Sequence, residues 1–324
     1  MFASSRNLVK YFFRLSLKAL ITIAALAVVS ASNAQIRVSN PVLSIGISGN
    51  WGGAIDSVQV LGYEVVNAAD TGREIQSAVY FNTSNTGFYC GQDTPPWYAP
   101  SEAGDICNNK SPIYAIGADT TNLHVGVYPL DWAGRGQQPQ GLQIEGHHQI
   151  GPLPYSNHNE VARLGWRFLN YTGGSLNFMP DNPPVVACGL LPVPVPLLPA
   201  VYFDDSRLTR LFGLRMDSAW EEVSPYQASN GGDYCPSKYY YKAMAWMLPD
   251  LGWGVALYSR DTLNQAINFV AEEFPCCGTN NLSVVNQSIG VLADGAYVDR
   301  SLHLVVGNLG TIQAFVDELY SNGY

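Results

Sequence analysis

The stretch TGREIQSAVYF, residues 71–81, joins strand-like sequence to side chains that bind sugars or ions well. Its apolar residues alternate and its far end is rich in Val, Tyr and Phe, which predicts a β-strand. Alternation places Glu74, Gln76 and Tyr80 on one face of that strand and Arg73 on the other. A carboxylate, an amide and a phenol can hydrogen-bond sugar hydroxyls, so we predict that these four residues contact a saccharide. The alternative is a solvated strand face with Arg73 in a structural ion pair.

Aromatic clusters supply surfaces on which a sugar ring can lie. The sequence PPWYAP contains Trp97 and Tyr98, and YYYKAMAW adds a second cluster. We predict that Trp97 and Tyr98 stack against the ligand. The alternative is that such rings belong to the core, as at least half of them must in alternating strands.

Histidines and glutamates gather between residues 144 and 166, which hold three of the five histidines of the chain. His158 and Glu160 are two residues apart and share one face if the segment is extended. A carboxylate beside an imidazole can transfer protons near neutral pH. We predict His148, His158 and Glu160 as catalytic candidates, and the alternative is a polar loop with surface histidines.

A second group of acids lies late in the chain. Glu272 and Glu273 occur in NFVAEEFPCCG, directly before Phe-Pro and two cysteines. A carboxylate on a loop held by a disulfide is well placed for acid–base chemistry, so both are catalytic candidates. The alternative is a pair of exposed acids.

The motifs of several large enzyme classes are missing. The sequence has no P-loop, no G-x-G-x-x-G, no H-E-x-x-H, no G-x-S-x-G and no EF-hand loop. These absences exclude many cofactor enzymes, the commonest zinc proteases and the α/β-hydrolases. We expect no cofactor and no metal site, because a zinc site needs paired cysteines or Cys/His clusters.

Short strand-like runs separated by Gly- and Asn-rich turns must position these residues. Turn signals such as SGNWGG and NTSNTG alternate with runs such as VLSIGIS, ARLGWRFLNYT and GWGVALYS. This pattern predicts an antiparallel all-β fold. One short helix is expected at the C-terminus, where Thr311 could cap TIQAFVDELYSN and place Ile312, Phe315, Val316 and Leu319 on one face.

The first 34 residues have the pattern of a secretory signal peptide. Four basic residues and no acid precede a short apolar run, which ends in Ser32-Asn33-Ala34. The alternative is an uncleaved anchor. We expect residues 1–34 to be removed, residues 35–324 to form a single domain, and the protein to be secreted as an extracellular or periplasmic protein.

The charge balance limits the partners. The chain has 17 basic and 26 acidic residues, and loss of the four basic residues near the N-terminus leaves 13, for a net charge of −13. An acidic surface argues against nucleic acid and against anionic membranes, since both need a basic face. We expect a carbohydrate ligand, no nucleic acid and no membrane contact after cleavage, and the sequence leaves the oligomeric state open.

Six cysteines in an exported chain predict disulfides. Cys90 and Cys107 flank one loop and form the expected local pair. The other four are expected to bond with one another, Cys188 and Cys235 with the neighbours Cys276 and Cys277.

Two blocks of sequence resemble galactose-mutarotase-like proteins. GYEVVNAADTGREIQSAVYF resembles their early strands, and YYYKAMAWMLPDLGWGVALYS is similar to a hairpin of secreted bacterial relatives. The resemblance implies a β-supersandwich, in which two large antiparallel sheets enclose a sugar-binding groove on a concave face. It also implies a basic residue, a histidine and a late carboxylate in that order, which here are Arg73, His158 and Glu272 or Glu273.

Two classes of function follow. A carbohydrate-active enzyme, either a hydrolase or a lyase, would use the glutamates as acid and base, or Arg73 against a uronate carboxylate with His or Tyr as base. A glycan-binding or cell-surface structural protein on the same fold is the alternative, and a sugar epimerase is the third possibility. The set of His, Glu, Arg and Tyr side chains favours the enzyme.

Overall fold

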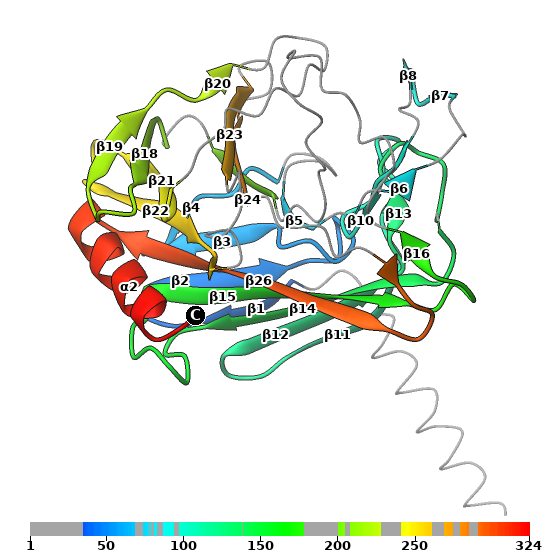
Figure 1. The fold of residues 1–324 in the computed structure, drawn as a ribbon, viewed down its shortest axis with the longest axis horizontal. Helices are drawn as coiled ribbons and strands as arrows, with labels where there is room; N and C mark the ends of the chain where they lie inside the picture. The colour runs from blue at the N-terminus through cyan, green and yellow to red at the C-terminus, as the bar shows by residue number, and fades with distance from the viewer. Residues whose placement is uncertain are drawn as a thin grey trace, which may run out of the picture. The chain divides into compact units, whose positions relative to one another are not determined.

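The computed structural model is built almost entirely from β-strands, with one helix at the C-terminus of the described chain (Figure 1). This confirms the predicted all-β, antiparallel architecture with a short C-terminal helix. All structural statements concern the described residues, which are 35–68, 74–77, 79, 81–82, 87–93, 97–137, 139–177, 200–204, 208–227, 241–260, 269–274, 279–284 and 291–324.

Several sequence predictions fall outside the described residues. They are the signal peptide at residues 1–34, Arg73, Tyr80 and the four later cysteines. The domain boundary after residue 34 and the later disulfides therefore stay predictions.

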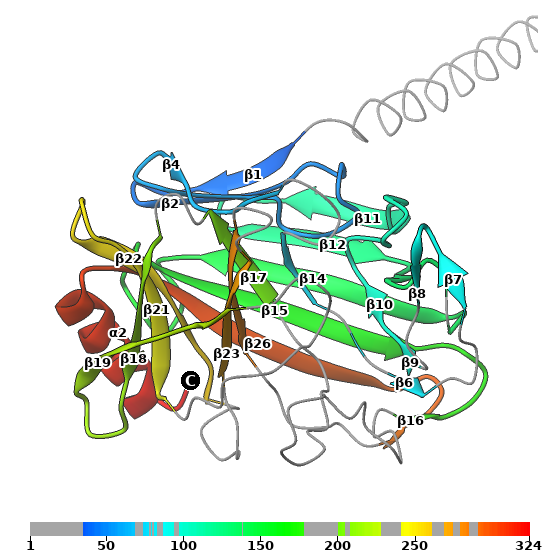
Figure 2. The ribbon, with the colours of Figure 1, turned by 90° about the horizontal axis from the view of Figure 1, so that it is seen from above.

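Nine described strands form the largest sheet, and each runs antiparallel to its neighbours (Figures 1 and 2). Strands from the middle of the chain pair with a strand near its end. The spatial order is β11 (Ile113–Ala118), β12 (Asn122–Val127), β14 (Leu142–Ile150), β15 (Val161–Asn170), β26 (Tyr297–Gly307), β22 (Trp253–Tyr258), β21 (Ala243–Leu248), β18 (Arg210–Leu214) and β19 (Trp220–Val223).

Two smaller sheets lie over one face of this sheet (Figures 1 and 2). We call that face the inner face and the opposite one the outer face. The first small sheet has the order β1 (Ile36–Ser39), β2 (Leu43–Ile47), β3 (Ser57–Val60) and β4 (Tyr63–Glu64). The second has the order β20 (Tyr226–Gln227), β23 (Phe269–Phe274), β24 (Thr279–Val284), β17 (Ala200–Asp204) and β5 (Ile75–Gln76).

Short two-stranded ladders complete the described strands. They pair β6 (Phe81–Asn82) with β9 (Trp97–Tyr98), β7 (Phe88–Tyr89) with β8 (Gln92–Asp93), β10 (Pro100–Ser101) with β13 (Leu130–Asp131), and β16 (Leu176–Asn177) with β25 (Val291–Leu292).

The main core lies between the inner face and the small sheets. Along β14, every second residue from Leu142 to Ile150 is buried, as the period of a strand requires. Leu164, Trp166 and Phe168 on β15 continue the same buried face and belong to one apolar cluster with residues of both small sheets. Burial of this alternating apolar set holds the layers together.

The helix α2 (Leu309–Ser321) covers one end of the outer face. Ile312, Val316 and Leu319 are buried there, as the periodicity predicts. The predicted cap was wrong, because Asn308 and not Thr311 is the N-cap. The Asn308 side chain accepts a hydrogen bond from Thr311 N at 2.9 Å, which satisfies one of the free N–H groups of the first turn.

The segment SVQVLGYE, residues 57–64, forms a hairpin of β3 and β4. Leu61 and Gly62 form its turn with φ values of 50° and 85°, so both lie in the left-handed region that a two-residue hairpin turn needs.

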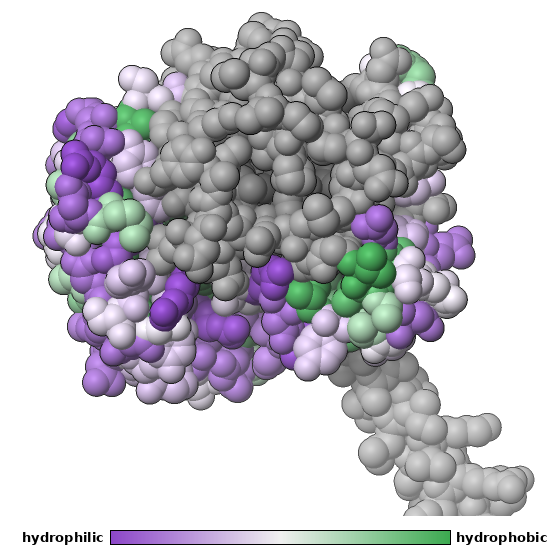
Figure 3. All heavy atoms as spheres, viewed as in Figure 1, coloured by the Kyte–Doolittle hydropathy of each residue, from purple (hydrophilic) through white to green (hydrophobic). Residues whose placement is uncertain are grey.

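In the space-filling view, hydrophilic side chains gather over β18, β19 and α2 (Figure 3). None of the described helices has the length and apolar character needed to cross a membrane.

Candidate functional site

Residues 76–77 and 101–102 are separated in the sequence but adjacent in the structure, and together they form a group of buried polar side chains. Beside Ser77, the Glu102 amide donates a hydrogen bond to the Ser77 carbonyl at 3.3 Å. The Ser77 hydroxyl donates to Glu102 Oε2 at 2.5 Å, and the Ser101 hydroxyl donates to Gln76 Oε1. All four residues are buried. With two residues of the large sheet they form what we call the inner polar cluster: Gln76, Ser77, Ser101, Glu102, His148 and Trp166.

The Glu102 carboxyl is the chemically most unusual group of this cluster. Its burial raises its pKa to about 8, although the Ser77 hydroxyl and, more weakly, the Trp166 indole act to lower it. The carboxyl therefore keeps its proton at neutral pH. Its Oε1 is buried and has no hydrogen-bond partner of its own within the described part of the chain.

Trp166 and His148 extend the cluster across the inner face. Their rings meet edge to face with centroids 5.3 Å apart. Gly146 lies directly opposite Trp166 on the neighbouring strand, and a Cβ there would come within 2.6 Å of His148 Nε2. The glycine therefore makes the room that the imidazole occupies.

His148 is a neutral imidazole without partners. It is 1% exposed, and neither ring nitrogen has a hydrogen bond within the described part of the chain. Burial lowers its pKa to about 3, and the nearby His147, His124 and Arg163 act in the same direction. Such a ring is a poor proton acceptor, but it can donate one hydrogen bond and accept another.

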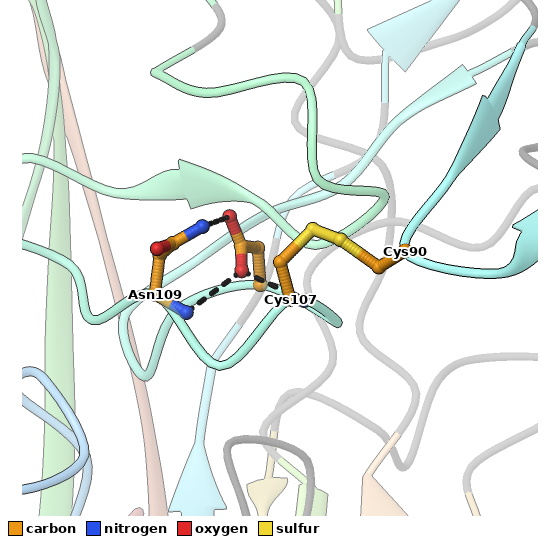
Figure 4. The surroundings of a disulfide bond; sticks show 4 residues. Cys90, Cys107 and Asn109 are labelled. Carbon is orange, nitrogen blue, oxygen red and sulfur yellow. Dashed lines mark hydrogen bonds between the residues drawn. A yellow bond between two sulfur atoms is a disulfide. The ribbon is translucent and has the colours of Figure 1, made fainter.

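The loop that carries Glu102 is fixed on both sides. Gly52 approaches so closely that a Cβ would lie 2.3 Å from the Glu102 carbonyl oxygen, and the Gly53 amide donates to that oxygen at 3.0 Å. The predicted disulfide between Cys90 and Cys107 is confirmed and anchors the far side (Figure 4). The backbone that carries the carboxyl is thus held in place by Gly52 and Gly53.

Asp105 orders the turn between Glu102 and the disulfide. Its Oδ1 accepts from the backbone N–H groups of Cys107 and Asn109, both at 2.9 Å. Its Oδ2 accepts from the Asn109 side chain at 2.9 Å (Figure 4). Through these hydrogen bonds Asp105 stabilises the turn, as Asp side chains commonly do by accepting from backbone N–H groups a few residues on.

His158 and Glu160 lie in a different environment from the one the sequence suggested. They occur in a turn and not on an extended strand, so they do not share a strand face. His158 stacks on Phe315 of α2 with ring centroids 3.9 Å apart and hydrogen-bonds Glu318 Oε2 at 2.8 Å. This histidine fastens the helix, and the structure does not bring it to the inner polar cluster.

The structure describes the side chains of some of the remaining predicted residues and not of others. Glu74 is fully buried beside Gln76 in the chain. The Tyr98 ring carries the Arg135 guanidinium at 4.7 Å from its centroid. Glu272 and Glu273 lie opposite Asn281 and Asn280 on β23 and β24, but their side chains, like that of Trp97, are outside the described set.

Sequence reasoning missed four members of the cluster, Ser77, Ser101, Glu102 and Trp166. Glu102 stands in WYAPSEAGDIC, where small residues surround it between an aromatic pair and a cysteine. An acid in such a small-residue segment, next to a disulfide, was the available signal. No group of three or more His, Cys, Asp or Glu side chains in the described ranges could hold a metal ion.

Comparisons with known proteins concern the fold. No family model matches the chain, and no curated protein matches its sequence. The structure of the Slr1438 protein from Synechocystis sp. PCC 6803 matches with a TM-score of 0.51 and 10% identity, over 85% of this chain and 96% of that one.

Two further structures match over a similar length. One is a galactose mutarotase related enzyme from Lactobacillus acidophilus, with a TM-score of 0.49 and 10% identity over 85% of this chain and 98% of the other. The other is a provisionally assigned aldose 1-epimerase from Escherichia coli K12, with a TM-score of 0.49 and 12% identity over 85% and 99%. At 10% identity the likeness to the Slr1438 structure shows the fold alone, and it agrees with the β-sandwich that the sequence predicts.

Proposed function

We propose that the protein is a carbohydrate-active protein that holds a saccharide at the inner polar cluster, with Glu102 as general acid. The observation that carries this proposal is the buried Glu102 carboxyl, which accepts a hydrogen bond from Ser77 at 2.5 Å and whose pKa burial raises to about 8. A carboxyl that keeps its proton near neutral pH can donate it to the leaving oxygen of a glycosidic bond. A carbohydrate ligand also agrees with the sequence resemblance to galactose-mutarotase-like proteins.

The other members of the cluster have the chemistry of a sugar-binding site. Gln76 and Ser101 offer an amide and a hydroxyl, and Trp166 offers an indole N–H beside the Glu102 carboxyl. His148 stays neutral and has both ring nitrogens available. We assign His148 to hydrogen bonding with the saccharide, because its low pKa makes it a poor catalytic base.

The reaction class we propose is hydrolysis or lyase cleavage of a polysaccharide or oligosaccharide. Both reactions need a proton on the leaving oxygen, which Glu102 can supply. The base or nucleophile then comes from the remaining predicted residues, among which Glu74 lies two positions before Gln76 in the chain. From the pattern of residues 1–34 we also propose that the protein is secreted.

The test combines a substrate panel with one substitution. The full-length protein is incubated with neutral and acidic polysaccharides, and both reducing ends and unsaturated products are followed. We expect Glu102→Gln to lower turnover at least about 100-fold while glycan binding persists. Activity of the unaltered protein should fall as pH rises through about 8, because Glu102 then loses its proton.

A matched control replaces Glu222, an exposed acid paired with Arg210 on β18 and β19. Glu222→Gln should leave turnover unchanged. Equal activity of Glu102→Gln and the unaltered protein would remove Glu102 from the mechanism, whatever the substrate.

Glycan binding without turnover is the second candidate. The complete burial of Glu102 and His148 favours it, since a substrate must reach these groups before any bond can break. Retention of the protein on one immobilised glycan, with no products formed from any member of the panel, would establish this candidate instead.

A further inference from the structure

The outer face of the large sheet carries a grid of polar side chains beyond the end that α2 covers. In one cross-strand row, Glu145 on β14 lies opposite Arg167 on β15, which lies opposite Asp299 on β26. In a second row, His147 lies opposite Gly165. The rows continue the strand alternation that buries His148 and Trp166 on the other side.

A third row continues the grid toward α2. In it, Gln149 lies opposite Arg163, and Arg163 lies opposite His303. The outer face therefore presents two arginines of one strand, Arg163 and Arg167, with Gly165 at the outward position between them.

A hollow of about 140 Å³ opens at the centre of this grid. Its floor is Gly165, whose missing side chain leaves the space free: a Cβ there would lie 2.8 Å from the His147 carbonyl oxygen and 3.4 Å from Arg163 Nη1. Arg163, Arg167 and Asp299 line it, together with Arg300, which lies opposite Trp166 on β26. The local charge is thus positive in a chain with a net charge of −9.

Arg163 is the group that lacks a partner. Arg167 donates to both Asp299 oxygens, at 2.8 and 3.0 Å, and lies over the Tyr297 ring at 4.2 Å. Arg163, in contrast, has no hydrogen bond and no ion pair within the described ranges, and it is only partly exposed. A partly buried guanidinium without a counter-charge is unfavourable, and a bound anion would satisfy it.

Neighbouring groups do not neutralise Arg163. His303 is almost completely buried, and its Nε2 is engaged with the Tyr155 hydroxyl at 2.8 Å. Burial and the Arg163 charge hold the pKa of His303 at about 4, so this ring is neutral. Hydrogen bonds from Arg167 and, to a lesser extent, the Arg163 charge lower the pKa of Asp299, but that carboxylate accepts no hydrogen bond from Arg163.

We propose that this hollow binds an oxyanion, the sulfate, phosphate or carboxylate group of a ligand, through the guanidinium groups of Arg163 and Arg167. The planar fork of arginine matches the paired oxygens of such a group. The volume fits one anionic group and not a whole sugar chain, so the rest of a larger ligand would lie along the exposed grid. The site is on the face opposite the inner polar cluster and does not depend on the function proposed there.

The first test uses inorganic sulfate as the probe. Binding to the full-length protein is measured by calorimetry at constant ionic strength, with chloride as the replacing anion. We expect saturable binding that Arg163→Gln weakens at least tenfold and that Arg163→Lys, which keeps the charge but not the fork, weakens less. The control is Arg210→Gln, an exposed arginine paired with Glu222 at the far edge of the sheet, which should bind as the unaltered protein does.

Two results would overturn the proposal. One is the absence of saturable sulfate binding, and the other is equal binding by Arg163→Gln and Arg210→Gln. Because none of these variants alters Glu102, failure here leaves the general-acid proposal untouched, and failure of the Glu102 test leaves this one untouched.

A second set of probes distinguishes the sources of the anion. Sulfated, uronate-containing and neutral oligosaccharides are compared with inorganic sulfate and phosphate. Tighter binding of one anionic oligosaccharide, lost in Arg163→Gln, identifies the anionic group of a glycan as the ligand. Equal affinity for the free ion and the oligosaccharides identifies a free anion site, and binding of the neutral oligosaccharide alone contradicts the proposal.

Discussion

His147 and His148 are neighbours on β14, yet they belong to two opposite electrostatic environments. His147 is on the outer face, where its side chain is 40% exposed, contacts Glu145 Oε2 at 3.4 Å and meets His124 Nδ1 at 3.1 Å. His148 is on the inner face, 1% exposed, with no partner for either nitrogen in the part of the chain that the structure describes. One residue step along a strand therefore separates a hydrated histidine from a desolvated one.

The two faces of the sheet differ in whether they favour neutral or charged side chains. On the inner face, desolvation favours neutral forms, so Glu102 stays protonated and His148 stays uncharged. On the outer face, charges persist in pairs such as Arg167 and Asp299. The inner face is suited to proton donation and hydrogen bonding, and the outer face to recognition of charge.

The largest expected contrast concerns packing. Trp166→Ala should lower the free energy of unfolding by about 3–5 kcal/mol, because it leaves a cavity in place of a fully buried ring. Tyr297→Ala on the outer face, where the ring is 57% exposed, should change it by less than about 1 kcal/mol. Chemical denaturation measures both, and similar losses in the two variants would contradict the division into a packed inner face and a solvated outer face.

The second contrast concerns acid. Burial lowers the folded-state pKa of His148 to about 3, below the usual 6.5, so the unfolded chain takes up a proton first as the pH falls. His148 therefore contributes a loss of stability that grows from about pH 6.5 downward and levels off below pH 3. Unfolding midpoints measured from pH 7 to pH 4 should decline less in His148→Phe than in the unaltered protein.

The neighbouring substitution on the outer face serves as the comparison. His147→Phe should keep the acid sensitivity that His148 causes, because it leaves the buried imidazole in place. If His147→Phe, and not His148→Phe, flattened the decline, the assignment of the two faces would be wrong.

The sequence was sufficient for those features that local pattern determines. Alternation predicted the strands around Ile45 and Val255, and the helical period predicted which side of α2 is buried. Loop spacing predicted the bond between Cys90 and Cys107. Each of these depends on residues close in the chain or on a repeating period, which a single sequence displays directly.

The inner polar cluster could be predicted only in part. Gln76 and His148 were recognised by type, but Glu102 was not, because its importance comes from pairing with Ser77 and from burial against Trp166. His158 was selected for its neighbour Glu160, yet its partner is Glu318, which lies far along the chain. Burial and long-range pairing fix such roles, and one sequence does not display either.

The smallest expected effect tests whether the outer-face charges contribute to stability or only to recognition. Arg167 and Asp299 form two hydrogen bonds, but their side chains are 35% and 49% exposed. A double-mutant cycle with Arg167→Ala and Asp299→Ala should give a coupling free energy of about 0.2–1 kcal/mol, smaller in high salt. A coupling well above this range would mean that the pair supports the sheet itself. A small coupling, together with weaker anion binding by Arg167→Ala, would instead mean that these charges contribute to ligand binding and little to the stability of the fold.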